Sequence, residues 1–417
     1  MAHAMLRILL AKISDGQIVL IDGDDRSVFG TPSSDIGLRA TLRVLDPRFY
    51  SQVLLGGSLG AGETYLRGLW DTDDLTSLLR IFVRNLHIAD RLEGFFSLVG
   101  APFARIQHFL RQNTRRGSRR NIYAHYDLGN DFFALFLDET MTYSAGIFER
   151  ADSTLRDASV AKLDRICRKL RLCSSDHVIE IGSGWGSFAI HAASKYGCRV
   201  TTTTISEEQH ALATERVSEA GLSDRINVLL KDYRTLDGRY NKLVSIEMIE
   251  AVGHRFLDTY FKKCSELLTD DGAMLLQAIT MPDQRYAQYR RSVDFIRKYI
   301  FPGSCVPSVG AMSRAVARVT DFRQVHLEDI GPHYATTLKH WHERFVDRAD
   351  AVRELGYPEE FIRMWRYYLS YCEAGFAERY IGDVQILFAK QGNRFPVTLG
   401  DLERTRSYSQ GAEGGDA

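Results

Sequence analysis

The feature that most constrains this chain is a buried strand that runs directly into a glycine-rich turn. The segment reads Val178-Ile179-Glu180-Ile181-Gly182-Ser183-Gly184-Trp185-Gly186 and is followed by a helical pattern. Glycines at alternate positions let backbone N–H groups approach a ligand where any Cβ would collide, and the following helix presents its positive N-terminal end. The turn predicts a site for a nucleoside-bearing cofactor. The alternative interpretation is a strand-to-helix turn that binds nothing.

The spacing of the glycines distinguishes between cofactors. A dinucleotide site has the pattern G-x-G-x-x-G with an acid about twenty residues later. Here the pattern is E-x-G-x-G-x-G, and Ser187 stands where the third glycine is expected. The next strand, residues 199–204, leads into Thr204-Ile205-Ser206-Glu207-Glu208-Gln209 with no acid at its tip. This version is typical of S-adenosylmethionine (SAM) methyltransferases, and a nicotinamide cofactor is disfavoured.

Length, charge and cysteine content set wider limits. A chain of 417 residues is long enough for two domains. Its 53 basic and 53 acidic side chains balance, so no global field favours nucleic acid. The six cysteines lack the paired C-x-x-C spacing of a metal or redox site, which predicts reduced thiols in a cytosol. The twelve histidines show no metal-ligand spacing either, so no metal site is expected.

The chain divides into four predicted parts. Residues 1–102 form an N-terminal domain, with β-like runs at 17–21 and 42–44, a helix at 75–86 and no recognisable catalytic constellation. Residues 103–121 form a basic linker rich in arginine, either a solvated joint or a surface for the phosphates of an anionic membrane. Residues 122–400 form the main domain, and residues 401–417 a polar, glycine-rich flexible tail. The apolar run at residues 5–13 is too short to span a membrane.

The main domain alternates strands and helices. We expect strands at residues 178–181, 199–204, 226–230, 242–246 and 273–279, with helical patterns between them. This rhythm predicts an α/β fold with a doubly wound, mostly parallel sheet covered on both faces, as in class I SAM methyltransferases. A smaller domain precedes it.

Six ordered motifs give the chain a specific resemblance. They are His125-Tyr126-Asp127-Leu128-Gly129-Asn130-Asp131-Phe132-Phe133, Met141-Thr142-Tyr143-Ser144, the glycine turn, Asp232-Tyr233-Arg234, Phe301-Pro302-Gly303 and His333-Tyr334-Ala335-Thr336-Thr337-Leu338. In this order they resemble the bacterial cyclopropane-fatty-acyl-phospholipid synthases and mycolic acid cyclopropane synthases. The similarity is strong over residues 120 to 390, and residues 1 to 115 more loosely resemble the additional N-terminal domain of the phospholipid-acting members.

The resemblance implies a reaction. The methyl group of SAM passes to the cis double bond of an unsaturated phospholipid acyl chain, which is a poor nucleophile and must be held in line in a dry pocket. The resulting carbocation is stabilised by aromatic faces. A base then removes a proton from the new methyl group, and a cyclopropane ring closes. In the family this base is a bound bicarbonate.

The resemblance also implies which residues serve this chemistry. The bicarbonate-binding glutamate falls at Glu250, the tyrosine at Tyr334 and the backbone carbonyl at Ile279, while Tyr126 is the pocket tyrosine. Cys372 matches a cysteine considered reactive in the family, although no adjacent base is visible in the sequence and a buried structural role is the alternative.

Two positions depart from the family pattern. Gln277 replaces a histidine and Ala145 replaces a cysteine, and both changes touch the same anion. Glutamine can donate a hydrogen bond but cannot carry charge or relay a proton as imidazole does. The sequence therefore leaves open whether bicarbonate binds and whether the product is a cyclopropane or, through loss of a different proton, a methyl-branched unsaturated chain.

The cofactor residues implied by the resemblance lie at strand ends. Tyr143 and Ser144 approach the methionine end of SAM, and Tyr233 and Arg234 flank the adenine. The floor and the ribose region comprise Val178, Glu180, Gly182, Ser183, Gly184, Trp185, Gly186, Thr204, Ile205 and Gln209.

Three functional classes follow. The favoured one is a cytoplasmic SAM-dependent C-methyltransferase, peripherally associated with the inner face of the membrane, that acts on unsaturated phospholipid. A methyltransferase for a soluble small molecule is the second, because fold does not dictate substrate. A lipid-binding protein that has lost its chemistry is the third. By analogy, members with the additional domain suggest a homodimer.

Overall fold

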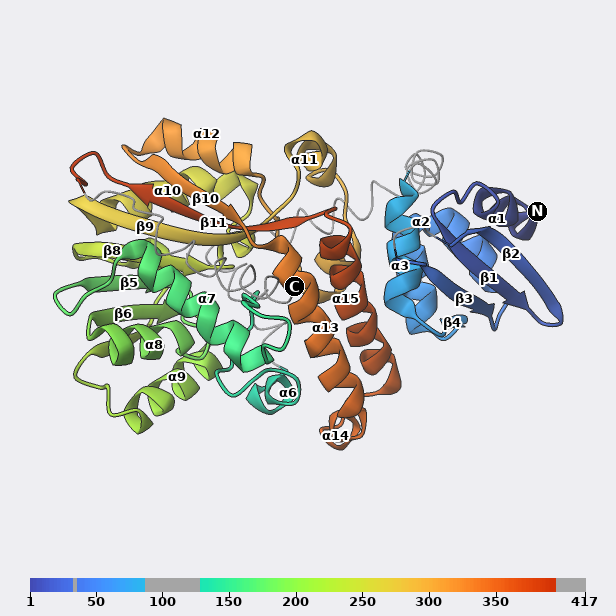
Figure 1. Cartoon of the computed structure of the whole chain (residues 1–417), viewed down its shortest axis with the longest axis horizontal. Helices are drawn as coiled ribbons and strands as arrows, with labels where there is room; N and C mark the ends of the chain where they lie inside the picture. Colours follow the sequence, from blue (N-terminus) through green and yellow to red (C-terminus); the bar gives the residue numbers. More distant parts are fainter. Residues whose placement is uncertain (33–35, 87–127, 395–417) are drawn as a thin grey trace, which may run out of the picture.

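The computed structural model describes residues 1–32, 36–86 and 128–394, which form a small N-terminal α/β domain and a large α/β domain (Figure 1). The predicted linker, the boundaries on either side of it and the tail lie outside these residues. Among the described residues, no helix combines the length and the apolar character needed to cross a bilayer.

The N-terminal domain packs three helices against a four-stranded sheet of order β2-β1-β3-β4. Strand β1 pairs antiparallel with β2 and parallel with β3. The expected runs at 17–21, 42–44 and 75–86 correspond to β1, β3 and α3. The elements are α1 (Ala2–Leu10), β1 (Gly16–Asp22), β2 (Asp25–Thr31), β3 (Arg39–Val44), α2 (Arg48–Leu66), β4 (Trp70–Thr72) and α3 (Leu75–Arg84).

The large domain is built on a seven-stranded sheet of order β10-β11-β9-β8-β5-β6-β7. Strands β9, β8, β5, β6 and β7 pair in parallel along this order, whereas β11 is antiparallel to both of its neighbours. This confirms the predicted mostly parallel, doubly wound α/β sheet. The strands are β5 (His177–Ile181), β6 (Arg199–Thr204), β7 (Ile226–Leu230), β8 (Tyr240–Ile246), β9 (Leu268–Thr280), β10 (Arg323–Asp329) and β11 (Gly382–Ala389).

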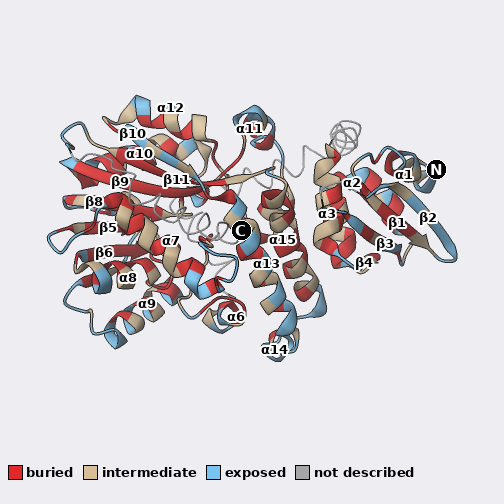
Figure 2. Ribbon diagram, viewed as in Figure 1, coloured by how far each residue is buried: buried red, intermediate tan, exposed pale blue. Residues whose placement is uncertain are grey.

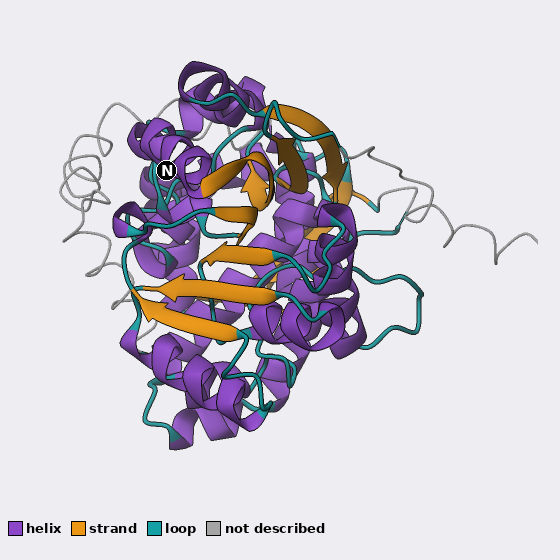
Figure 3. Ribbon diagram, turned by 90° about the vertical axis from the view of Figure 1, so that its left-hand side faces the viewer, coloured by secondary structure: helices purple, strands orange, loops and turns teal. Residues whose placement is uncertain are grey.

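Helices cover both faces of this sheet (Figure 3). Successive strand residues face opposite cores: Ile179 and Leu276 pack with α10 and α12, whereas Val178 and Leu275 pack with α7 and α8. The central strands are therefore apolar on both faces and almost continuously buried (Figure 2). The helices are α6 (Asn130–Ala134), α7 (Leu155–Leu170), α8 (Ser187–Tyr196), α9 (Glu207–Glu219), α10 (Leu257–Leu267), α11 (Asp283–Tyr289), α12 (Val309–Val319), α13 (Gly331–Asp347), α14 (Ala349–Glu354) and α15 (Glu359–Ala377).

Helix α15 connects the two domains. It packs on α13 on one side and on α2 and α3 of the N-terminal domain on the other (Figure 1). Gly62 of α2 lies close to the large domain, because a Cβ there would stand 3.1 Å from Cε1 of Tyr367 on α15 and 2.6 Å from Cδ2 of Phe295, just before the π-helical turn η4 (Ile296–Ile300). At the end of α15, Glu378 accepts hydrogen bonds from Nε of Arg80 at 2.6 Å and Nε of Arg84 at 2.7 Å, which fixes α3 against it.

A half-buried ion pair between α7 and β10 makes stability depend on pH. Arg165 and Lys169 bind Glu328, and this pairing lowers the pKa of Glu328 to about 2 in spite of its burial. The folded-state pKa lies below the ordinary value of 4.5, so the stabilisation is complete above that value and is lost as the pH falls towards 2.

We expect Glu328→Gln to remove roughly 2–3 kcal/mol of acid-sensitive stability, measured as the free energy of unfolding between pH 6 and 3. The stability curve of the variant should be flatter than that of the wild type over this window. Equal slopes for the two proteins would contradict this assignment.

Candidate functional site

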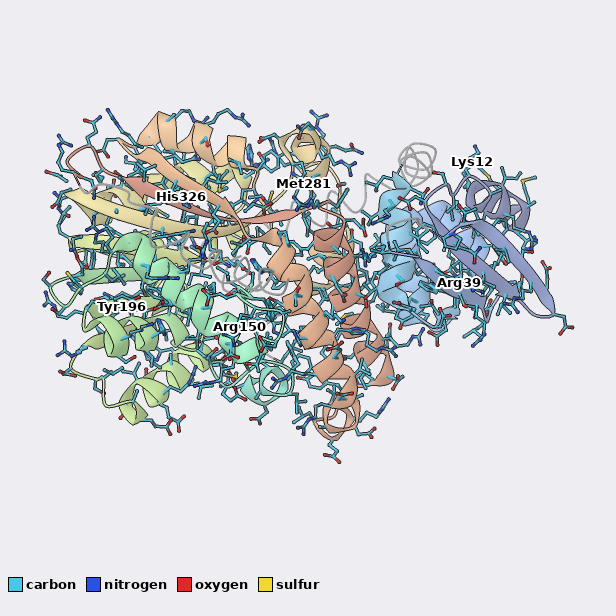
Figure 4. The ribbon with its side chains drawn as sticks, viewed as in Figure 1. Lys12, Arg39, Arg150, Tyr196, Met281 and His326 are labelled. Atoms are coloured by element: carbon cyan, nitrogen blue, oxygen red, sulfur yellow. The ribbon has the colours of Figure 1, made fainter. Side chains whose placement is uncertain are left out.

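A cavity of about 590 Å³ opens at the carboxyl ends of β5, β6 and β8 and continues to the N-terminal domain. Parallel sheets bind ligands at this edge. The cavity passes the glycine turn and the aromatic side chains of α13 and α15, and it reaches Phe49 and Val53 of α2 and Leu78 of α3. Met281, just after β9, lines it and is labelled in Figure 4 on the side of the large sheet that faces the N-terminal domain. The wall of the cavity is mostly apolar, with polar groups near the carboxyl ends of the strands.

The glycine turn has the backbone that the sequence predicts. Gly182, Gly184 and Gly186 have φ angles of +98°, +49° and +86°, a region that side chains with a Cβ rarely adopt. A Cβ on Gly182 would stand 3.1 Å from Met248 at the tip of β8. Gly182 and Ser183 donate their N–H groups to the carbonyl of Thr203, which fixes the turn against β6. The turn thus leaves a bare backbone cradle that fits a nucleoside-bearing methyl donor.

Most of the predicted cofactor residues meet around this cradle. Those that line the cavity are Tyr143, Ser144, Glu180, Gly182, Ser183, Gly184, Trp185, Thr204, Ile205, Gln209, Tyr233 and Arg234. Gly186 caps α8, and Val178 packs its side chain into the core, so a direct part for these two residues stays a prediction. Nε of Arg234 donates a hydrogen bond to Asp232 at 2.9 Å. Asp232 also lines the cavity, although it was not among the predicted cofactor residues.

Two buried ionisable side chains, Glu180 and Lys162, line this part of the cavity. Glu180 accepts a hydrogen bond from Oγ1 of Thr202 at 2.6 Å, and its burial raises its pKa to about 8. Lys162 donates to Oγ of Ser144 at 2.6 Å, and burial lowers its pKa to about 8. Attraction between the charged forms of Glu180 and Lys162 opposes the effect of burial on both pKa values.

The predicted catalytic residues are only partly brought together. Among the described residues, no hydrogen bond joins Tyr334 or Gln277 to Glu250. Both residues donate to Glu247 instead. The Tyr334 hydroxyl donates to Oε2 of Glu247 at 2.7 Å, and the Gln277 amide donates to Oε1 of Glu247 at 2.8 Å. Glu250 accepts from the Ile279 N–H at 2.6 Å through one oxygen, and the other has no partner among the described residues. Burial raises the pKa of Glu250 to about 8.

Two further predicted residues remain without a tested role. Cys372 lines the cavity, and burial raises the pKa of its thiol. A raised pKa favours the buried structural role over a reactive thiolate. Tyr126 lies outside the described residues. Among the described residues, no three His, Cys, Asp or Glu side chains are placed to hold a metal ion.

Sequence reasoning missed Glu247, Lys162 and Asp383. Glu247 directly follows β8, and an acid at the tip of a parallel strand was a signal available in the sequence. Lys162 lies within a helix and Asp383 on the antiparallel strand β11, far along the chain, and neither belongs to a recognisable motif. Only the fold brings these two near Glu247.

The surroundings of the cavity are strongly aromatic. Tyr334 stacks on Phe376 with ring centroids 4.4 Å apart, and the hydroxyl groups of Tyr143 and Tyr368 are 2.9 Å apart. Phe301 lies edge-on to Tyr368 at 6.1 Å. These rings line the cavity together with the glycine turn, and their faces can stabilise a cation.

The comparisons with known proteins agree with this geometry. Residues 113–386 match the family model of mycolic acid cyclopropane synthetase. The tuberculostearic acid methyltransferase UfaA1 of Mycobacterium tuberculosis is 39% identical over 81% of this chain and 80% of its own length. The cyclopropane-fatty-acyl-phospholipid synthase of Escherichia coli is 36% identical over 84% of this chain and 88% of its own length.

Solved structures extend the match to the fold and the cofactor. The mycolic acid cyclopropane synthase CmaA1, solved with SAH and CTAB, superposes with a TM-score of 0.61 at 32% identity, over 65% of this chain and 98% of that chain. The cyclopropane synthase MmaA2 of M. tuberculosis gives the same TM-score at 31% identity over the same shares. The curated relatives are cyclopropane fatty acyl synthases and related lipid methyltransferases. The chain belongs to the mycolic acid cyclopropane synthetase family and is a SAM-dependent methyltransferase.

Proposed function

We propose that this enzyme transfers the methyl group of SAM to the cis double bond of an unsaturated phospholipid acyl chain at the membrane surface. The observation that carries the proposal is the continuity of the cavity from the glycine turn to the apolar core of the N-terminal domain. A long apolar chain can lie along this path with its double bond at the cradle. A small polar acceptor would leave most of the apolar wall unused.

The chain's own residues supply position and environment. When bound, SAM supplies an electrophilic methyl group on a positively charged sulfur. The bare backbone of the turn admits it closely, while the aromatic wall excludes water and faces the carbon that becomes positive. Lys162, through Ser144, and Tyr143, through Tyr368, fix the polar rim of the cavity.

For the product, a cyclopropane is the first candidate, supported by the name of the E. coli relative and by the family. A methyl-branched unsaturated chain is the second. It is favoured by Gln277 and Ala145 at the family's histidine and cysteine positions and by the relative that is named as a tuberculostearic acid methyltransferase. Both products gain one CH2, so mass alone does not separate them.

The test incubates the enzyme with methyl-labelled SAM and vesicles of monounsaturated phospholipid. We expect label in the acyl chain, and proton NMR of the purified lipid then separates high-field cyclopropane methylene signals from olefinic and branched-methyl signals. A soluble acceptor would instead be methylated without vesicles. If no label reaches the lipid while SAM still binds, the lipid proposal is wrong.

A further inference from the structure

Glu247 has an unusual backbone that directs its side chain into the cavity. It follows the last residue of β8 and has φ of +48°, which is uncommon and strained for a residue with a Cβ. Its N–H donates to the carbonyl of Gln277 at 2.9 Å, so the conformation is held by the neighbouring strand β9. The side chain is partly exposed, and it lines the cavity. Maintained strain of this kind is typical of functional positions.

The carboxylate of Glu247 is fixed by three donors, one from the loop before α7, one from β9 and one from α13. Oε1 accepts from the Ala145 N–H at 2.9 Å and from Nε2 of Gln277 at 2.8 Å. Oε2 accepts from the Tyr334 hydroxyl at 2.7 Å. These contacts leave the carboxylate little rotational freedom. A preorganised anion of this kind needs little rearrangement before it accepts a proton.

Gln277 is itself oriented by a buried chain of side chains. Its Oε1 accepts from Nε2 of Gln385 at 3.0 Å, and Oε1 of Gln385 accepts from Lys169 at 2.8 Å. The amide group of Gln277 must therefore turn towards the acids, where it donates to Glu247 and, at 3.1 Å, to Asp383. Gln277 is thus a positioning residue for the Glu247 carboxylate.

Negative charge in this cluster is best supported on Glu247. Burial and the neighbouring acids raise the pKa of Asp383 well above its usual range, and burial raises that of Glu250. Burial also raises the pKa of Glu247, but the Lys162 charge and the three donors oppose that effect. The remaining acids that line the cavity are engaged elsewhere: Glu180 accepts from Thr202, Asp232 from Arg234, and Asp294 from the Arg297 N–H at 2.8 Å.

We propose that the Glu247 carboxylate is the base that removes a proton from the methylated acyl chain. The inference rests on the proposed function and identifies a catalytic residue for it. The chain would then carry in its own sequence the anion that the family resemblance assigns to bound bicarbonate, because Gln277 and Tyr334 already bind Glu247.

The step balances in atoms and charge. The C–S electron pair stays on sulfur, the π electrons of the double bond form the new C–C bond, and the adjacent carbon becomes positive. Glu247 takes one proton and becomes a neutral acid. The electron pair of the broken C–H bond forms either the third ring bond or a new double bond. The positive charge brought by the sulfonium and the negative charge of the carboxylate both disappear.

The first test is Glu247→Gln, which keeps the size of the side chain but removes its basicity. We expect transfer of labelled methyl to lipid to fall by at least about 100-fold, as for the loss of a general base. Affinity for SAM, measured by calorimetry, should stay within about threefold of wild type. The matched control is Glu373→Gln, a half-buried acid of α15 that accepts a hydrogen bond from Thr76, and this variant should keep its activity.

A second variant separates chemistry from structure. Glu247→Gly removes the carboxylate and relieves the strained backbone, and we expect ¹³C-labelled formate to bind in the vacated space. NMR line broadening of formate should occur with this variant and not with the wild type. Added formate should also restore part of the methyl transfer, whereas a purely structural role for Glu247 predicts no such recovery.

The outcomes separate the two proposals. Wild-type enzyme that binds SAM but never labels lipid overturns the proposed function and this inference with it. Wild-type enzyme that labels lipid, together with Glu247→Gln within threefold of it, overturns the inference alone. Loss of wild-type activity in carbonate-free buffer, restored by bicarbonate, also overturns it in favour of a bound bicarbonate.

Discussion

Replacing Gly182 with valine is expected to weaken SAM binding by at least about 100-fold, which corresponds to about 2.7 kcal/mol. Gly182 has φ of +98°, which a β-branched residue adopts only with strain, and its Cβ would meet Met248 at 3.1 Å. The added methyl groups would also enter the cradle itself. Calorimetry with purified variant and SAM measures the effect, and circular dichroism checks that the fold survives.

Gly197→Val is the matched control for this substitution. Gly197 caps the other end of α8 with φ of +70°, and its Cβ would stand 3.4 Å from Ser174. The backbone strain is similar in kind, but Gly197 does not belong to the turn. We expect lower stability and unchanged SAM affinity. If the two variants lose affinity equally, the turn is not the cofactor site.

Replacing Gly62 with leucine is expected to loosen the contact between the domains and to reduce lipid methylation by at least tenfold. A Cβ at this position would stand 2.6 Å from Phe295 and 3.1 Å from Tyr367, so helices α2 and α15 must move apart. Overpacking of this kind costs about 1–3 kcal/mol. Urea unfolding measures the loss of stability, and labelled methyl transfer to vesicles measures the loss of activity.

Gly56→Leu is the control, because Gly56 lies in the first segment of α2, before the break at Gly57, and has no neighbour within 4 Å of its Cβ position. This variant should retain both the stability and the activity of the wild type. Unchanged lipid methylation in Gly62→Leu would show that the acyl chain does not need the closed contact between α2 and α15.

The sequence predicted the parallel part of the fold well for a physical reason. The strands at 178–181 and 226–230 are short, largely apolar runs bounded by turns, and residues 199–204 are a run of β-branched residues after Arg199. All three match β5, β7 and β6 to within one residue. Helix α2 was missed because its four glycines weaken any helical pattern, and one of them, Gly57, breaks the helix with φ of +57°.

The cofactor cradle was predictable because it is local, whereas the acid cluster was not. The turn joins one strand to the next helix, so its spacing appears directly in the sequence. The donors to Glu247 come from Ala145, Gln277 and Tyr334, which are far apart in the sequence, and only the fold reveals that they share one acceptor. The resemblance placed Tyr334 and Gln277 beside Glu250, three residues from the acid that they contact.

The contact of α2 with α15 has a consequence for how such enzymes can diversify. The matched cyclopropane synthases cover 65% of this chain and 98% of their own, so they correspond to the large domain without most of the preceding residues. In this chain, Phe295 and Tyr367 are shielded by a helix of the smaller unit. Removing that unit or grafting another in its place would uncover these rings, so the two modules must change together.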